Sequence, residues 1–104
     1  MTKILSSARL KNTTDKRSRR EQPKLFKVFL HNDDYTTMDF VVEILEKVFH
    51  KNNTEAISLM LQVHQRGMAL CGIYPFEIAE TRVDKVHKEA RQAGFPLRCS
   101  LDPE

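Results

Sequence analysis

Apolar and polar positions in residues 24–104 follow two spacings, and the changes between them divide the chain into short elements. Leu25–His31 is a short run rich in β-branched and aromatic side chains, which predicts a strand. From Met38 to His50 the apolar residues recur three and four positions apart, which predicts an amphipathic helix. Thr36, three residues before Asp39, is expected to cap that helix.

Turn and cap residues predict the boundaries of the later elements in the same way. These elements are a helix capped by Asn53 or Thr54 and ended by Gly67, a strand at Met68–Tyr74, a helix with Pro75 at its first position and Gly94 at its end, and a strand at Pro96–Leu101. The resulting order is β-α-α-β-α-β. This order predicts an α+β fold, a two-layer α/β sandwich in which three helices cover a three-stranded antiparallel sheet.

Residues 1–23 show little periodicity and carry a net positive charge. Seven Lys and Arg residues against two acidic residues give this segment a charge of +5, so residues 24–104 carry −2 of the total of +3. We therefore expect a flexible basic N-terminal arm at 1–23 and one core domain at 24–104. The arm is either a solvated tail, a phosphate-binding arm or an element engaged by a partner. A mildly acidic core argues against nucleic acid as the partner of the domain.

Composition and spacing exclude several other classes. No apolar run approaches the roughly 20 residues that span a bilayer, and no secretory signal is present, so we expect a cytoplasmic protein without a membrane partner. Cys71 and Cys99 lack C-x-x-C spacing and are expected to be reduced, buried thiols. The four histidines form no H-x-x-x-H pattern, so no metal and no cofactor are expected.

A polar cluster lies between the first predicted strand and the first predicted helix, in the run Asn32-Asp33-Asp34-Tyr35-Thr36-Thr37-Met38. An amide and two carboxylates between two regular elements are typical of a binding loop on a rigid scaffold. The same residues also suit a plain turn, which places negative charge near a helix N-terminus.

A second group of chemically interesting residues lies on the second predicted helix. Met60, Val63 and His64 are spaced to share one face, on which the first two are most simply core residues and His64 is either structural or functional. If this face meets the polar loop, hydrogen-bond acceptors would rim an apolar pocket. Such a pocket suits a charged α-amino group attached to an apolar side chain. Burying an aromatic side chain, worth about 4–6 kcal/mol, together with charge-assisted hydrogen bonds would allow micromolar binding.

Several motifs resemble those of one family. The run Val28–Val41 resembles the pattern V-x-L-x-N-D-D-Y-T-P-M-x-F-V of ClpS, the adaptor that delivers N-degron substrates to the ClpAP protease. Met60–His64 looks like the M-L-x-V-H motif of that family. Three shorter elements keep the same order and spacing, namely Cys71-Gly72, Ala79-Glu80-Thr81 and Pro96-Leu97.

The resemblance implies a function and a set of site residues. It implies a non-catalytic adaptor that recognises proteins with a free N-terminal Phe, Tyr, Trp or Leu and hands them to the ClpA unfoldase. Asn32, Asp33 and His64 would hold the α-amino group of the substrate. The residues that would line the side-chain pocket are Asp34, Thr36, Met38, Val41, Met60, Val63 and Leu97, with Met38 as a gate against β-branched side chains.

The resemblance also implies a protein partner. Glu77 and Arg82 match positions that contact the N-terminal domain of a ClpA-type AAA+ unfoldase, and the arm at 1–23 would be engaged by that unfoldase during delivery. We expect the adaptor itself to be a monomer. Thr37 stands where the family usually has Pro, and Arg98 beside Leu97 is unusual, so a divergent paralogue is compatible with the pattern.

Two other classes of function are weighed against this one. An enzyme could use Asp33, Asp34 and His64 as acid–base groups, but the motifs hold no plausible nucleophile, metal-ligand set or glycine-rich phosphate loop. A ribosomal or nucleic-acid module could share the small α/β sandwich, but the acidic core argues against it.

Overall fold

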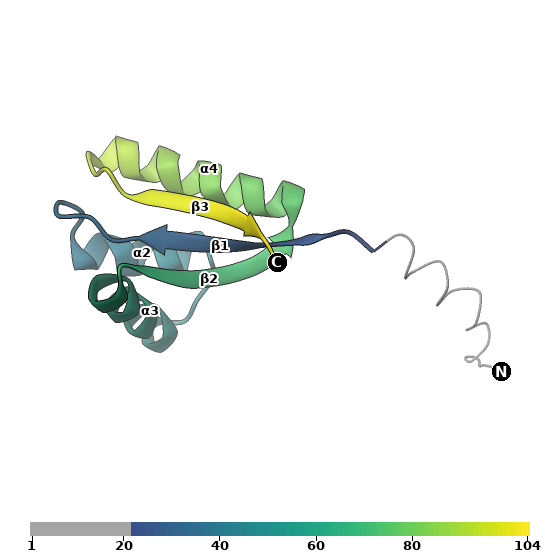
Figure 1. Cartoon of the computed structure of the whole chain (residues 1–104). Helices are drawn as coiled ribbons and strands as arrows, with labels where there is room; N and C mark the ends of the chain where they lie inside the picture. The colour runs from purple at the N-terminus through teal and green to yellow at the C-terminus, as the bar shows by residue number, and fades with distance from the viewer. Residues whose placement is uncertain (1–21) are drawn as a thin grey trace.

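The computed structural model describes residues 22–104, so the predicted arm at 1–23 lies, except for its last two residues, outside the described residues. The elements in chain order are β1 at Leu25–His31, α2 at Met38–Lys47, α3 at Asn53–Arg66, β2 at Met68–Pro75, α4 at Phe76–Ala93 and β3 at Arg98–Pro103. The central strand β1 pairs antiparallel with both β2 and β3. The three helices lie on one side of this sheet (Figure 1). The predicted α+β sandwich, with its β-α-α-β-α-β order, is confirmed.

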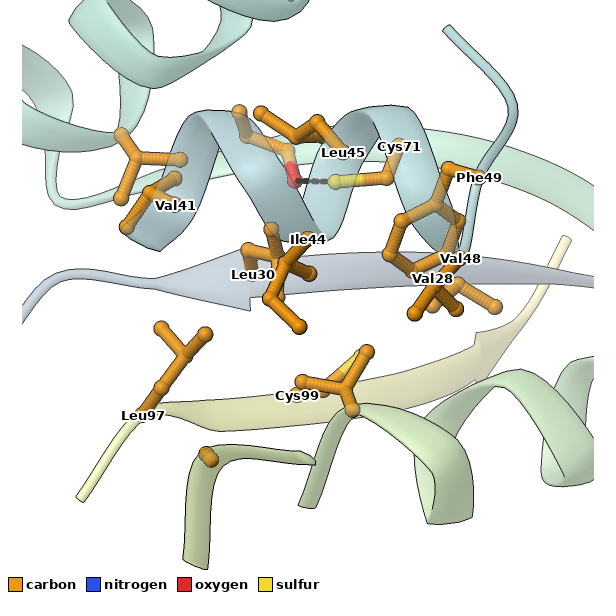
Figure 2. Packing of buried hydrophobic residues seen from close by; sticks show 14 of the residues in the cluster. Val28, Leu30, Val41, Ile44, Leu45, Val48, Phe49, Cys71, Leu97 and Cys99 are labelled. Atoms are coloured by element: carbon orange, nitrogen blue, oxygen red, sulfur yellow. Dashed lines mark hydrogen bonds between the residues drawn. The ribbon is translucent and has the colours of Figure 1, made fainter. Parts of the chain in front are cut away.

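The core lies between the sheet and the helices, and strand alternation decides which residues enter it. Val28 and Leu30 of β1 are fully buried, whereas the side chain of Phe29 between them points to the opposite face. Ile44 and Leu45 of α2 close over them (Figure 2). Val86 of α4 belongs to the same buried cluster. Each of these side chains contributes roughly 1.5–3 kcal/mol through its burial. The core therefore fixes how the helices sit on the sheet, and with them the loops that join the elements.

Strand β2 contains a β-bulge at Cys71. Val28 is opposite Gly72 while the next residue of β1 is opposite Leu70, so Cys71 is the extra residue of β2. Cys71 points into the core, where its thiol donates a hydrogen bond to the Ala69 carbonyl (Figure 2). Both cysteines are free and buried, as predicted, and burial raises the pKa of each thiol to about 12.

Two predicted helix caps are wrong by one or two residues. The N-cap of α2 is Thr37 and not Thr36, because the Thr37 hydroxyl accepts from the Phe40 N–H at 3.1 Å while Thr36 turns to another partner. The N-cap of α3 is Asn52, which forms a complete capping box with Glu55. Several adjacent polar residues could each have served as a cap, and the backbone path selects one.

Two proline-containing boundaries also differ from the prediction. Pro75 is the last residue of β2 and precedes α4, instead of occupying its first turn. The last strand begins at Arg98, where the pairing with His31 starts, and runs on to Pro103. Pro96 has no N–H to donate to a strand ladder, which explains why pairing starts only after it.

Along residues 22–104, no helix combines the length and the apolar character needed to cross a membrane.

The one-sided cover of the sheet gives a testable prediction about stability. Leu30 is 0% exposed on the helix side, whereas Leu70, on the adjacent strand and the bare face, is 38% exposed. We expect Leu30→Ala to lower the free energy of unfolding by roughly 2–5 kcal/mol because it leaves a cavity. Leu70→Ala should lower it by about 1 kcal/mol or less. Urea unfolding measures both, and equal losses would show that the bare face is covered.

Candidate functional site

The loop between β1 and α2 is organised around one carboxylate. Asp33 Oδ1 accepts hydrogen bonds from the backbone N–H groups of Tyr35, at 2.8 Å, and Thr36, at 2.7 Å. Asp33 Oδ2 accepts from the Thr36 hydroxyl at 2.7 Å. An Asp side chain that bonds the backbone two and three residues ahead is a local turn that the sequence itself specifies. The plain-turn interpretation of this cluster therefore holds for Asp33, and it leaves the neighbouring polar side chains available.

The end of α3 lies against this loop. The Asn32 N–H donates to the Gly67 carbonyl at 2.9 Å, which ties the residue after β1 to the residue that ends α3. Gly67 has a φ of 90°, in the left-handed region that favours glycine. The last turn of α3, which carries Val63 and His64, is thereby held beside the loop.

A cavity of about 250 Å³ opens between the loop, α2 and α3. Nine of the ten residues that were predicted to bind a substrate line it, and they are Asn32, Asp33, Asp34, Thr36, Met38, Val41, Met60, Val63 and His64. The two clusters that lie apart in the sequence therefore meet in one place.

The cavity has an apolar interior and a polar rim. Val41 and Val63 are buried and form its walls, and Met60 is half-buried beside them. Met38 is 44% exposed, so its flexible side chain stands at the edge of the cavity. Among the described residues no Lys or Arg lines the cavity, and the polar groups at its rim include those of Asn32, Asp34 and His64. The arrangement offers hydrogen-bond acceptors and negative charge around an apolar surface.

The hydrogen bonds to Asp33 also decide its charge state. Burial, the largest influence, raises the pKa of this carboxyl, but the Thr36 hydroxyl and the backbone N–H groups of Thr36 and Tyr35 lower it, and together they leave the pKa below its ordinary value. Asp33 is therefore ionised at neutral pH. Because the folded-state pKa is depressed, the stability that this group contributes is present above its unfolded-state pKa and is lost as pH falls through its folded-state pKa.

Leu97, the tenth of the residues predicted to bind a substrate, does not line this cavity. Its side chain is 3% exposed and belongs to the core, at the same end as Val41 (Figure 2). Leu97 instead forms part of a second cavity at the junction of α4 and β3.

The two predicted partner residues lie on α4. Glu77 is exposed in the first turn of the helix. Arg82 is half-buried, and its guanidinium donates to the Val48 carbonyl at 2.7 Å and lies 3.1 Å from His50 Nε2 and 5.4 Å from the centre of the Tyr74 ring. Arg82 thus clamps the end of α2 to α4. The sequence carried no signal for this contact, because Arg82 and Val48 are 34 positions apart.

Metal ligands are absent from the described part of the chain. Within residues 22–104, no three His, Cys, Asp or Glu side chains converge in a way that could hold a metal ion.

These features define a small α/β-sandwich domain with an acceptor-rimmed apolar cavity at the end of its central strand. Residues 21–100 match the family model described as "ATP-dependent Clp protease adaptor protein ClpS". The chain belongs to the ClpS family of Clp protease adaptors.

Individual relatives agree with this assignment. An ATP-dependent Clp protease adapter protein ClpS from Desulfatibacillum aliphaticivorans is 52% identical over 91 residues, which are 88% of each chain. The protein of the same name from Nautilia profundicola is 58% identical over 80 residues, covering 77% of this chain and 82% of that one. Among solved structures, Agrobacterium tumefaciens ClpS2 bound to L-phenylalaninamide superposes with a TM-score of 0.77 at 37% identity, covering 80% of this chain and all of that one.

The hydroxyl of Thr36 provides a direct test of how the loop holds its charge. We expect Thr36→Val to raise the pKa of Asp33, because one of its hydrogen bonds is lost, and to lower the stability at neutral pH by about 1 kcal/mol. This loss should shrink as pH falls through the folded-state pKa of Asp33, since a protonated carboxyl gains less from the same donor. Carboxyl-carbon NMR titration reads the pKa. Thr36→Ser, which keeps the hydroxyl, is the control, and an unchanged pKa in Thr36→Val would contradict the assignment.

Proposed function

We propose that this protein is a non-catalytic adaptor that recognises proteins with a free N-terminal Phe, Tyr, Trp or Leu and delivers them to a ClpA-type unfoldase. The observation that carries the proposal is the cavity at the loop, in which hydrogen-bond acceptors, with no Lys or Arg among the described lining residues, surround buried apolar walls. A charged α-amino group next to a large apolar side chain complements both halves of this cavity.

The amine would bind to Asn32, Asp33 and His64. A free α-amino group ordinarily has a pKa of about 8, so at neutral pH it is mostly charged and has three N–H donors. The amide oxygen of Asn32 and a ring nitrogen of His64 accept two of them. An ionised carboxylate accepts about four hydrogen bonds, of which three are made within the loop at Asp33, so one site remains for the ligand. The exposed carboxylate of Asp34 adds negative charge at the rim, and the Thr36 side chain completes the edge.

The apolar side chain of the N-terminal residue would enter between α2 and α3. Val41, Met60 and Val63 supply its walls, and Met38 at the edge would close against it and disfavour β-branched residues. Thioether side chains adapt to rings of different shape. The Agrobacterium relative was solved with L-phenylalaninamide, a compound with a free α-amino group and a benzyl side chain, and this ligand supports the same chemistry here. Leu97 would contribute from the core at this end of the domain.

The unfoldase would bind at the start of α4, at the opposite end of β2 from the cavity. Glu77 is exposed there between Phe76 and Ile78, two large apolar side chains that are also exposed. A charged residue flanked by exposed apolar ones is typical of a protein contact. We propose that this surface meets the N-terminal domain of the unfoldase, and that Arg82 supports it by holding α2 against α4.

Two free, buried thiols suit the reducing cytoplasm in which such an adaptor would work.

Recognition of the amine predicts a charge-dependent affinity. We expect a fluorescent peptide with a free N-terminal Phe to bind in fluorescence anisotropy, and the same peptide with an acetylated N-terminus to bind at least about tenfold more weakly. Asp33→Asn keeps an oxygen for the loop hydrogen bonds but removes the charge. It should therefore lower the affinity for the free peptide by about 10- to 100-fold. Asp39→Asn, on an exposed α2 residue outside the cavity, is the matched control and should change the affinity less than about twofold.

Equal affinity for the free and acetylated peptides would refute amine recognition. An Asp33→Asn variant that binds as tightly as the Asp39→Asn control would show that Asp33 serves the loop alone.

The proposed delivery role predicts variants that keep their affinity for the peptide but slow degradation of the substrate. Deleting residues 1–21 should leave the affinity for the free Phe peptide unchanged and slow ClpAP degradation of a protein with N-terminal Phe by about tenfold or more. Glu77→Lys should have the same pattern through weaker unfoldase binding, whereas Glu43→Lys, on the exposed side of α2, should not. Unchanged degradation rates in both variants would show that neither the segment nor the α4 surface serves delivery.

A further inference from the structure

A second cavity lies next to the candidate site and has the opposite charge. It measures about 330 Å³ and is lined by His87, Arg91, Phe95, Pro96, Leu97 and Arg98, at the junction of α4 and β3. Arg91, Arg98 and His87 are among the residues that line this cavity, and no Asp or Glu of residues 22–104 is. The proposed recognition of an N-terminal residue makes no use of it.

The two arginines are not neutralised within the described residues. The ion pair found in residues 22–104 joins Lys47 to Glu89, so neither Arg91 nor Arg98 has a carboxylate within ion-pair distance there. Both side chains are exposed. Two exposed arginines beside a cavity suit an anionic ligand, because the planar fork of Arg matches a carboxylate.

The charges of both arginines affect the pKa of His87, which also lines the cavity. His87 Nε2 accepts a hydrogen bond from the Cys99 N–H at 3.0 Å, which anchors the ring between α4 and β3. Burial most strongly lowers the pKa of His87, and the charges of Arg91 and Arg98 lower it further, against an opposing effect of Asp84. On the other face of the sheet, burial and then Arg98 lower the pKa of His31, against Asp102. The charge of Arg98 therefore acts on histidines of both faces of the sheet.

The two cavities are close enough for one extended peptide to reach both. Asn32, at the rim of the first cavity, directly follows His31, and His31 is paired with Arg98 of the second cavity. With about 3.8 Å between consecutive Cα atoms and about 4.8 Å between strands, the Cα atoms of Asn32 and Arg98 are at most roughly 9 Å apart. Figure 1 shows the end of β1 and the start of β3 at the same end of the sheet. An extended chain advances about 3.3 Å per residue, so it covers this distance in about three residues.

We propose that the basic cavity binds an acidic side chain at the third or fourth position of the substrate, so that this adaptor selects N-terminal sequences with Glu or Asp shortly after the bulky residue. This inference rests on the proposed function, because the first residue must occupy the first cavity. Asp34 at the rim repels a carboxylate placed closer to the amine, which restricts the preference to positions beyond the second.

The test compares two peptides on three proteins. The peptides begin Phe-Ser-Glu-Glu and Phe-Ser-Gln-Gln, share the rest of their sequence and carry a free N-terminus. Against the wild-type protein in fluorescence anisotropy, the Glu peptide should bind about three- to tenfold more tightly. The double variant R91Q/R98Q should lose this advantage and bind the Gln peptide as the wild type does. The variant K85Q removes a charge from an exposed α4 residue outside the cavity and should keep the advantage.

Each remaining outcome separates this inference from the proposed function. Equal binding of the two free peptides to the wild type, with binding lost on acetylation, overturns the inference and leaves amine recognition intact. An advantage that survives in R91Q/R98Q, or that is lost equally in K85Q, overturns it as well, because general charge attraction then explains the effect. If the acetylated Glu peptide binds as tightly as the free one, amine recognition fails, and the inference fails with it.

Discussion

One backbone hydrogen bond, from the Asn32 N–H to the Gly67 carbonyl, joins the two halves of the candidate site. It becomes possible because Gly67 adopts a left-handed conformation that ends α3 and returns the chain to the sheet as β2. The pairing of β2 with β1 begins on the adjacent residues, at His31 and Met68. The loop after β1 and the last turn of α3 are therefore fixed by the sheet itself, and the cavity between them is as rigid as the strand pairing.

The carboxylate of Asp33 has two roles in the loop between β1 and α2. It closes the loop through three hydrogen bonds, and these same bonds keep it ionised and hold it at the rim of the cavity. Acceptors that are already oriented lose little conformational freedom when a ligand binds, which favours affinity without a large contact area. The proposed binding chemistry and the local fold thus depend on the same residue, which is why the amide variant is more informative than removal of the side chain.

The sheet separates the surfaces that the domain presents. The acceptor-rimmed cavity and the basic cavity flank the end of β1, whereas the exposed apolar side chains around Glu77 follow the far end of β2. The clamp from Arg82 to the Val48 carbonyl ties that second end to α2, whose other end borders the first cavity. A substrate and a partner protein could therefore occupy the domain together without competing for the same residues.

The sequence by itself determined the elements and most of the cavity. The bounds of β1 and the order of strands and helices follow from local spacing, because alternation and helical periodicity decide which side chains share a face. The nine lining residues were implied by the resemblance of two motifs to those of the ClpS family. Only the tertiary structure decided which of several neighbouring polar residues caps each helix, since Thr36 could cap α2 as well as Thr37 until Asp33 engages its hydroxyl. It also placed Leu97 in the core, paired Arg82 with Val48 and brought Arg91 beside Arg98. These contacts join residues that are distant in sequence or set by strand register, and no local pattern encodes such distances.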